Sequence, residues 1–330
     1  MEFQARFWNC LGSTLLAFAL ALEIAGAQDR ATEPTSAAFD PPTMTVGGHA
    51  FSPTSFMPDP FIRTFVRNSL GFGISPEFDI PPFEVGGREY SLKSGQLVYA
   101  LLEFEFQAAL RPWLAFGAQI TVNGRLATET LSLLSQGVVL INGYRLRALF
   151  DVARTKNLTI AVSAGAGNGG LVDISLARFI TAFVDSGAVT PEDELVSSTP
   201  SVYTFSEIRL AYGVNDLLGF LFTGELAYGE DPADRRSDRW FVSLAALADF
   251  NMNRRWGAPI GFSLGARTKT NPTGREEAGQ NVVSFLARVS YVGSRDFDLG
   301  VDLSYDIVPI ATLPEKVKFI SAVVDMRLIF

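Results

Sequence analysis

The chain has 330 residues, enough to bury a large core or to close one good-sized barrel. Its formal net charge of −8 argues against nucleic-acid binding, which needs a basic face. The single cysteine, Cys10, lies within the first 27 residues, so the rest of the chain cannot form disulfides or cysteine-ligated metal sites.

Residues 1–27 have the layout of a secretory signal peptide. Arg6 supplies a positive start, residues 15–22 are apolar, and Ala25-Gly26-Ala27 is a small-residue cleavage site. The alternative is a membrane-anchoring helix, but the apolar run is short for a bilayer span. The sequence therefore predicts secretion, with a mature chain that lacks cysteine.

Residues 28–60 are predicted to form a Pro-rich periplasmic linker. Prolines interrupt both helices and strand ladders, and here they stand at Pro34, Pro41, Pro42, Pro53, Pro58 and Pro60. The only histidine, His49, is expected to be a solvated loop residue, since no second histidine or cysteine could complete a metal site. We expect neither a metal nor a cofactor.

From residue 61 onward, apolar residues recur at every second position. In 96–110, for example, Leu102, Phe104 and Phe106 alternate with Glu103 and Glu105. Successive side chains of a strand point to opposite faces, so each such run predicts a strand with one apolar and one polar face. The runs to residue 330 predict roughly 12 strands, with about 10 to 14 possible, in an all-β, antiparallel up-and-down transmembrane barrel.

The predicted connections alternate in length, as short periplasmic turns and longer outer loops do in such barrels. The short ones are 111–112, 153–157, 213–216, 251–256 and 293–295; the longer ones are 75–95, 124–137, 168–200, 229–238, 269–280 and 306–316. A soluble β-sandwich or lipocalin-like barrel has the same period. The lipid-facing interpretation is favoured because the apolar face carries no charges and aromatic residues cluster near strand ends, at Trp113, Tyr144, Tyr228, Trp240, Tyr291 and Tyr305.

Two segments within the strand pattern have competing interpretations. Residues 165–170 match the G-x-G-x-x-G pattern of dinucleotide folds, but the preceding run alternates faces, which favours a strand that leaves the membrane through a glycine-rich loop. Residues 172–183 place apolar side chains on one helical face, at Val172, Leu176, Phe179, Ile180 and Phe183. This predicted helix either caps the barrel rim or folds inward and narrows the pore.

The polar face of the predicted strands carries charged residues of both signs, which are predicted to line the lumen. The basic candidates are Arg63, Arg67, Arg145, Arg147, Arg209, Arg267, Arg288 and Arg327, and the acidic ones are Glu103, Glu105, Glu207, Glu225, Asp298, Asp302 and Asp325. Either these charges neutralise one another inside a closed barrel, or opposed acidic and basic walls orient polar solutes and set selectivity.

The last fourteen residues, 317–330, alternate faces and end on an aromatic residue, with Phe330, Leu328 and Met326 on the apolar face. This run resembles the closing strand of Gram-negative outer-membrane β-barrels, a porin-like or transporter-like class. The resemblance implies that these residues form an assembly signal read by the barrel-assembly machinery. It also implies transit past periplasmic chaperones, location in the cell outer membrane, and contact with outer-membrane lipids.

The predicted function is a passive channel or transporter for small polar solutes. The alternative is a closed structural or surface-interaction barrel without transport. Outer-membrane phospholipases and omptin-type proteases are of similar size, but both require a histidine on the barrel, and the only histidine here lies in the predicted linker. We therefore expect no enzymatic activity and no nucleic-acid partner.

Overall fold

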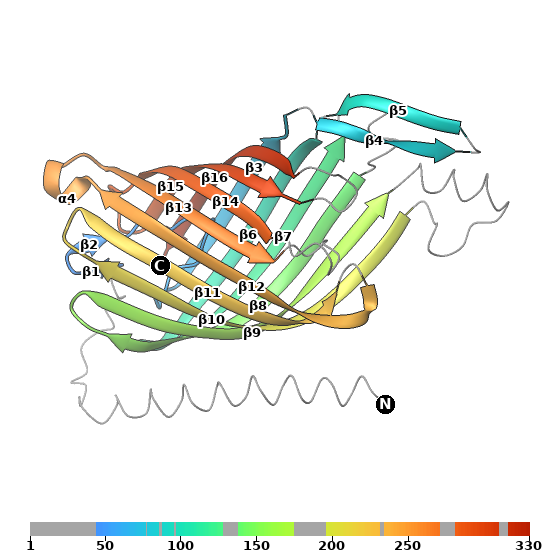
Figure 1. Ribbon diagram of the computed structural model, residues 1–330. Coiled ribbons are helices and arrows are strands. Elements are labelled where there is room, and N and C mark those ends of the chain that lie inside the picture. The colour runs from blue at the N-terminus through green and yellow to red at the C-terminus, as the bar shows by residue number, and fades with distance from the viewer. Residues whose placement is uncertain are drawn as a thin grey trace, which may run out of the picture.

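The protein is described from a computed structural model, for residues 44–76, 78–85, 88–95, 97–127, 138–174, 196–231, 234–270, 281–309 and 316–330. Twelve strands form one closed barrel in which neighbours along the chain pair antiparallel (Figure 1). The barrel strands are β3 (Phe65–Ile74), β6 (Leu97–Arg111), β7 (Leu114–Ala127), β8 (Val138–Arg154), β9 (Leu158–Ile174), β10 (Val196–Gly213), β11 (Leu218–Asp231), β12 (Asp234–Asn251), β13 (Ile260–Thr270), β14 (Asn281–Tyr291), β15 (Phe297–Val308) and β16 (Val317–Ile329).

The first and last barrel strands pair with each other and close the wall. Val324 of β16 lies opposite Leu70 of β3, and β9 pairs with β10 on the far side. The prediction of an even-stranded, up-and-down antiparallel barrel is thereby confirmed, with its strand number at twelve. A closed barrel with an even number of antiparallel strands is the architecture of bacterial outer-membrane barrels.

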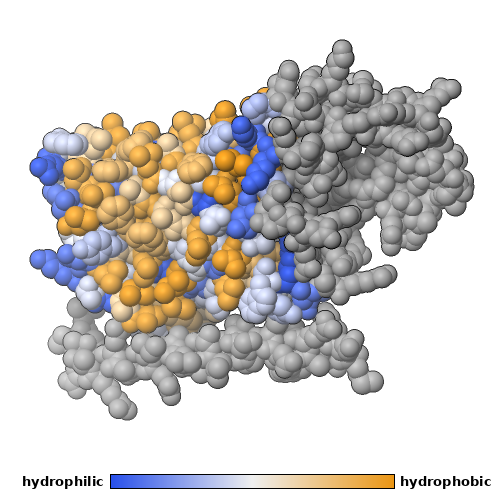
Figure 2. Space-filling view, viewed as in Figure 1, coloured by the Kyte–Doolittle hydropathy of each residue, from blue (hydrophilic) through white to orange (hydrophobic). Residues whose placement is uncertain are grey.

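Side chains alternate between an exposed outer face and a buried inner face. In β16 the exposed set includes Ile320, Val324 and Leu328, whereas Asp325 and Arg327 are buried. Figure 2 shows the exposed apolar side chains as an orange surface over the strands, with hydrophilic residues toward the end that carries the short turns. Exposed Leu, Phe, Ile and Val in such a continuous belt are matched to hydrocarbon, not to water.

Aromatic side chains border this belt near the strand ends, as predicted. Tyr144 and Trp240 are exposed at the long-loop end, and Tyr291 is exposed at the short-turn end. The rings of Tyr228 and Trp240 lie 4.8 Å apart on neighbouring strands. Amphipathic rings favour the interface between lipid and water, so the two borders mark the thickness of the membrane span.

The short connections fall where they were predicted, and one of them contains the helix α4 (Asn253–Trp256). Among the described residues, no helix is long and apolar enough to cross a bilayer. The outer hairpin of β4 (Phe78–Val85) and β5 (Arg88–Gly95) projects beyond the barrel at the end opposite α4 (Figure 1). The predicted loop 229–238 is instead mostly strand, because β11 and β12 continue to Asp231 and from Asp234.

The glycine-rich run 165–170 lies inside β9, paired with β8 and β10, so the expected glycine-rich loop is wrong and no dinucleotide fold is present there. A Cβ on Gly167 would meet the ring of Tyr203, which shows why the inward-facing positions are small. Val172 belongs to the same strand, and the rest of the predicted helix 172–183 lies outside the described residues after Ile174. The predicted signal peptide, 1–27, also lies outside them.

The N-terminal residues 44–64, here called the plug segment, fold into the lumen. They include the small hairpin of β1 (Thr45–Val46) and β2 (His49–Ala50) and then an irregular stretch that leads into β3. Phe51, Met57 and Phe61 are almost fully buried and pack with Leu221 and Leu247 of the wall. This part of the predicted linker 28–60 is therefore packed inside the barrel, and His49 is buried, not solvated.

Candidate functional site

In the described strands, the register puts opposite lumen charges directly across from each other at three places, of which one is Arg288 and Asp302. At the other two, Arg67 of β3 stands opposite Glu105 of β6, and Asp298 of β15 stands opposite Arg327 of β16. At two further places the register puts like charges across from each other: Arg67 opposite Arg327, and Glu207 opposite Glu225. Cross-strand pairs of opposite charge stabilise a sheet, whereas like charges directly opposite destabilise it. The strand register alone therefore pairs only part of the lumen charge.

The plug segment enters from the end of the barrel that carries the short turns. The Gly47 amide donates to the Lys156 carbonyl oxygen at 2.7 Å, in the turn between β8 and β9. Farther in, His49 Nε2 lies 3.0 Å from the Asp249 carboxylate, and the Ser52 amide donates to the same oxygen. Asp249 therefore holds the entering leg of the plug segment against β12.

The tip of the plug segment is held from three sides. The hydroxyls of Thr54 and Ser55 each donate to Asp302 Oδ2 at 2.9 Å. Arg67 donates to the Thr54 carbonyl oxygen, and Arg267 donates to that of Phe56 at 2.8 Å. The Arg267 guanidinium also lies 4.5 Å from the Phe56 ring centre, a distance at which a cation and a ring attract.

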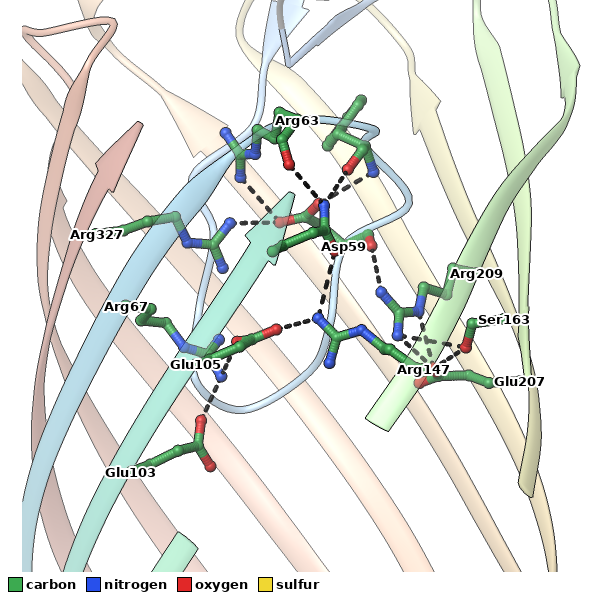
Figure 3. Close-up of polar contacts among 12 residues, drawn as sticks. Asp59, Arg63, Arg67, Glu103, Glu105, Arg147, Ser163, Glu207, Arg209 and Arg327 are labelled. Carbon is green, nitrogen blue, oxygen red and sulfur yellow. Dashed lines mark hydrogen bonds and ion pairs between the residues drawn. The ribbon is translucent and has the colours of Figure 1, made fainter. Parts of the chain in front are cut away.

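Asp59 is the hub of the returning leg (Figure 3). Its carboxylate accepts hydrogen bonds from Arg327 at 2.6 Å and from Arg63 at 2.9 Å, and its backbone carbonyl accepts one from Arg209. Burial by itself would raise the pKa of the Asp59 carboxyl, but Arg63 and Arg327 outweigh it and hold that pKa well below its usual range. Asp59 therefore stays ionised and ties the plug segment to β16.

Beside this hub, the wall carries two further ion-pair groups. Arg67 pairs with Glu103 and Glu105, and Glu105 also pairs with Arg147. On the facing wall, Arg209 Nη2 lies 2.5 Å from Glu207 Oε2. These side chains are buried, so each charge needs its partner to offset the loss of hydration.

A separate group surrounds Arg288, a fully buried side chain on β14. It pairs with Asp298 at 2.9 Å, with Asp302 at 2.6 Å and with Asp325. Three carboxylates around one guanidinium leave excess negative charge, and the hydroxyl donors of Thr54 and Ser55 on the plug segment are bound to Asp302. The plug segment thus completes the polar contacts of the wall.

The wall is also shaped to accept the plug segment, because glycines stand where it packs most closely. A Cβ on Gly219 would lie 2.5 Å from both the His49 and the Phe51 rings, and one on Gly261 would lie 2.8 Å from Ser52 Oγ. Real side chains essentially never approach so closely, so these positions form a glycine track under the plug segment.

The half of the lumen nearer the long loops is more open. Tyr99, Arg145, Tyr203, Glu225, Arg267 and Lys269 all point inward and keep partial exposure to solvent. Arg145 pairs with Glu225 at 2.5 Å, and its guanidinium lies 4.0 Å from the Phe205 ring centre. The lumen is therefore filled at the short-turn end and partly accessible to solvent at the other.

The predicted lumen-lining residues all face the interior, and all except Arg63 lie on strands; Arg63 lies on the plug segment. Ile62 lies an even number of positions before the exposed Leu70, so the alternation would place it on the lipid-facing side, but it is buried against Ala115, Leu149 and Ala161. A role for these charges in lining a solute path stays a prediction. The sequence analysis missed Asp59, Asp249, Lys269 and Asp306. The last three stand an even number of positions from other inward-facing residues of their strands, so the alternation of faces could have identified them.

His49, Asp249 and Ser263 form a hydrogen-bonded group inside the barrel, where the sequence predicted no histidine. Ser263 Oγ donates to Asp249 Oδ1 and His49 Nε2 contacts Asp249 Oδ2, so the carboxylate stands between the serine and the histidine. A nucleophilic serine instead needs the histidine as its direct base. All three side chains are fully buried, and no cluster that could hold a metal occurs among the described residues.

No family model matches the sequence, and no curated protein matches it. Among solved structures, an outer-membrane channel from Pseudomonas putida F1 is similar, with 10% identity, a TM-score of 0.48, and coverage of 84% of this chain and 99% of the other. The Pseudomonas putida toluene transporter TodX has 11% identity, a TM-score of 0.39, and coverage of 84% and 91%. A Pseudomonas aeruginosa FadL homologue has 10% identity, a TM-score of 0.41, and coverage of 88% and 98%. With TM-scores this low, none of these similarities indicates which solute, if any, passes through this barrel.

Proposed function

We propose that this chain is an outer-membrane channel or transporter for small polar solutes, constricted by its own plug segment. The observation that supports it most is the contrast along the lumen. Arg145, Glu225 and Lys269 are partly exposed in the long-loop half, whereas Arg63, Asp59 and their partners are buried in the other half. A polar, solvent-accessible vestibule above a plug held by ionic contacts suits regulated passage of solutes.

The plug segment is held by the apolar packing of Phe51, Met57 and Phe61 and by hydrogen bonds and ion pairs, not by a continuous strand ladder. Its contacts to Asp249, Asp302 and Arg327 come from side chains that remain anchored in the wall when the plug moves. Such contacts can be exchanged for water as the lumen opens, so the plug can shift without breaking the barrel. Opening would need only local rearrangement of residues 44–64.

The alternative function is a closed structural or surface-interaction barrel without transport. It is favoured by the full pairing of several lumen arginines, such as Arg288 with its three carboxylates. In that case the plug segment is a permanent part of the core.

We also propose that residues 1–27 act as a signal peptide and that β16 is read by the barrel-assembly machinery after transit past periplasmic chaperones. In support, Phe330, Leu328 and Met326 are exposed on the lipid-facing side at the chain end. Phe330 remains attached to the barrel through its amide, which donates to the Thr64 carbonyl oxygen at 3.0 Å.

Conductance in planar bilayers tests the channel proposal. The wild-type protein should show small or intermittent currents, and a variant lacking residues 28–58 should show larger and steadier ones, because the lumen beneath the vestibule is emptied. Heat-modifiable migration on gels would confirm that both barrels fold. If both fold and neither conducts, the closed-barrel alternative is correct.

A further inference from the structure

Two cations on β13, Arg267 and Lys269, differ from the other lumen cations in having no carboxylate partner. Every other lumen arginine named above forms an ion pair, for example Arg145 with Glu225 and Arg327 with Asp59. Within the described part of the chain, Lys269 has neither a hydrogen bond nor an ion pair, and Arg267 donates only to the Phe56 carbonyl oxygen. A cation without a salt bridge in a lumen keeps donors that a dissolved anion can bind.

Both side chains lie where a solute from the long-loop mouth would first meet the plug. They stand two residues apart on the inner face near the long-loop end of β13, and Arg267 touches the plug tip at Phe56. Their neighbours across the strands are small or apolar: Ser243 and Val282 beside Lys269, and Ala245 and Ser284 beside Arg267. Both cations keep partial exposure, so the place is reachable from the vestibule.

The local charge balance favours an anion. The ionised groups that act most strongly on Lys269 are Arg267, Asp306, Glu225 and Arg145. The carboxylates that act most strongly on Arg267 are Asp306, Glu103 and Glu225, and Glu103 is bound to Arg67. Glu225 is already paired with Arg145, and Asp306 accepts a hydrogen bond from Ser304 at 2.7 Å. Among the described residues, Asp306 is thus the one carboxylate near the β13 pair without an ion-pair partner, and one negative charge faces two positive ones.

We infer that Lys269 and Arg267 form a binding site for a small anionic solute that carries a carboxylate or phosphate group. The inference rests on the proposed function and names the solute class of that channel. The Arg267 guanidinium suits a planar or tetrahedral oxyanion, since its donors form a fixed fork. Its Nη1 holds the plug tip, whereas its Nη2 makes no hydrogen bond within the described part of the chain, so an anion can bind at Nη2 while the tip stays in place.

Lys269 supplies the second contact as a compact point charge on a flexible stem. It does not touch the plug segment in the described structure, so a change at Lys269 affects the anion and leaves the plug contacts intact. Rings of Lys or Arg favour anions in other pores, which is the same electrostatic principle. The site would concentrate anions above the constriction.

The test is calorimetric titration of the purified, folded barrel in detergent with acetate, inorganic phosphate and methylammonium. We expect acetate or phosphate to bind and methylammonium not to bind. Lys269→Gln should weaken anion binding at least tenfold, and Lys269→Arg should largely restore it. Lys318→Gln is the matched control, because Lys318 is an exposed lysine on the outer face of β16 near the same end. The preferred titrant distinguishes a carboxylate from a phosphate site.

Reversal potentials in a salt gradient separate this inference from the channel proposal. If the wild-type protein conducts but binds neither anion, or if Lys269→Gln binds them as tightly as Lys318→Gln does, the anion site is refuted while the channel stands. If anions bind in a Lys269-dependent way to a barrel that never conducts, the site stands and transport is refuted. Tighter binding of methylammonium than of either anion would overturn the inferred solute class.

Discussion

Removing the carboxylate of Asp59 should release the plug segment. In Asp59→Ala, Arg63 and Arg327 lose their shared partner, although both side chains are almost fully buried. Truncating one member of a buried ion pair costs about 3–5 kcal/mol, because the remaining charge is left uncompensated. If that cost falls on the closed position of the plug, its open population rises by roughly two to three and a half orders of magnitude.

Single-channel recording measures this population directly. Asp59→Ala should show frequent or sustained open events at voltages where the wild-type protein is mostly closed. Asp296→Ala is the matched control, since Asp296 is exposed in the turn before β15 and its side chain makes no hydrogen bond or ion pair with the plug segment. It should behave like the wild-type protein in both conductance and urea unfolding.

A charge-independent variant separates release of the plug from general damage. Gly219→Val leaves all ion pairs in place but puts a side chain where the His49 and Phe51 rings now pack, so it should open the lumen as well. If Asp59→Ala unfolds at lower urea while its conductance equals that of the wild-type protein, Asp59 stabilises the barrel without holding a gate. If Gly219→Val is also silent, the plug segment does not control the pore.

Three further outcomes are expected. Phe104→Arg, on the exposed face, should cost about 2–4 kcal/mol in urea unfolding from lipid vesicles, whereas Thr121→Arg, on the inner face opposite Glu103, should cost much less; equal costs would contradict the assignment of faces. Replacing Phe330 with Asp should reduce surface assembly and leave chain in the periplasm, and unchanged surface levels would count against an assembly signal. Because the pKa of Asp59 lies below its unfolded-state value of about 3.9, its contribution is complete above that value and is lost only as pH falls through the lower folded-state pKa. The effect of Asp59→Ala on conductance should therefore be the same at about pH 7 and pH 5, and loss of that effect at pH 5 would contradict the role given to Asp59.

The sequence by itself determined the barrel. Each strand faces lipid on one side and a polar lumen on the other, so a period of two is written into every strand, as in the alternation of Phe104 and Phe106 with Glu103 and Glu105. Short turns and longer connections then fix the up-and-down order. These are local features, and local features are what a single sequence displays.

The sequence alone predicted the structure less well where side-chain size, and not polarity, determined it. The run 165–170 suggested a loop because glycines are common there, yet its glycines serve β9 by leaving room for the inward-facing Tyr203 and Phe205. The neighbouring strand supplies the reason, and that strand lies about forty positions away in the register of β9 with β10. Strand pairing therefore had to be known first.

Only the tertiary structure decided where residues 44–64 lie and which lumen charges meet. The plug segment has no periodicity, and its burial depends on partners such as Asp249 for His49 and Arg327 for Asp59, which are some 200 and 268 positions away. Contacts across a lumen follow from the closure of the barrel, not from spacing along any strand. In the closed barrel Arg145 forms an ion pair with Glu225, whereas Lys269 forms none within the described residues. The sequence does not show this difference, because both cations simply occupy inward-facing positions of their strands.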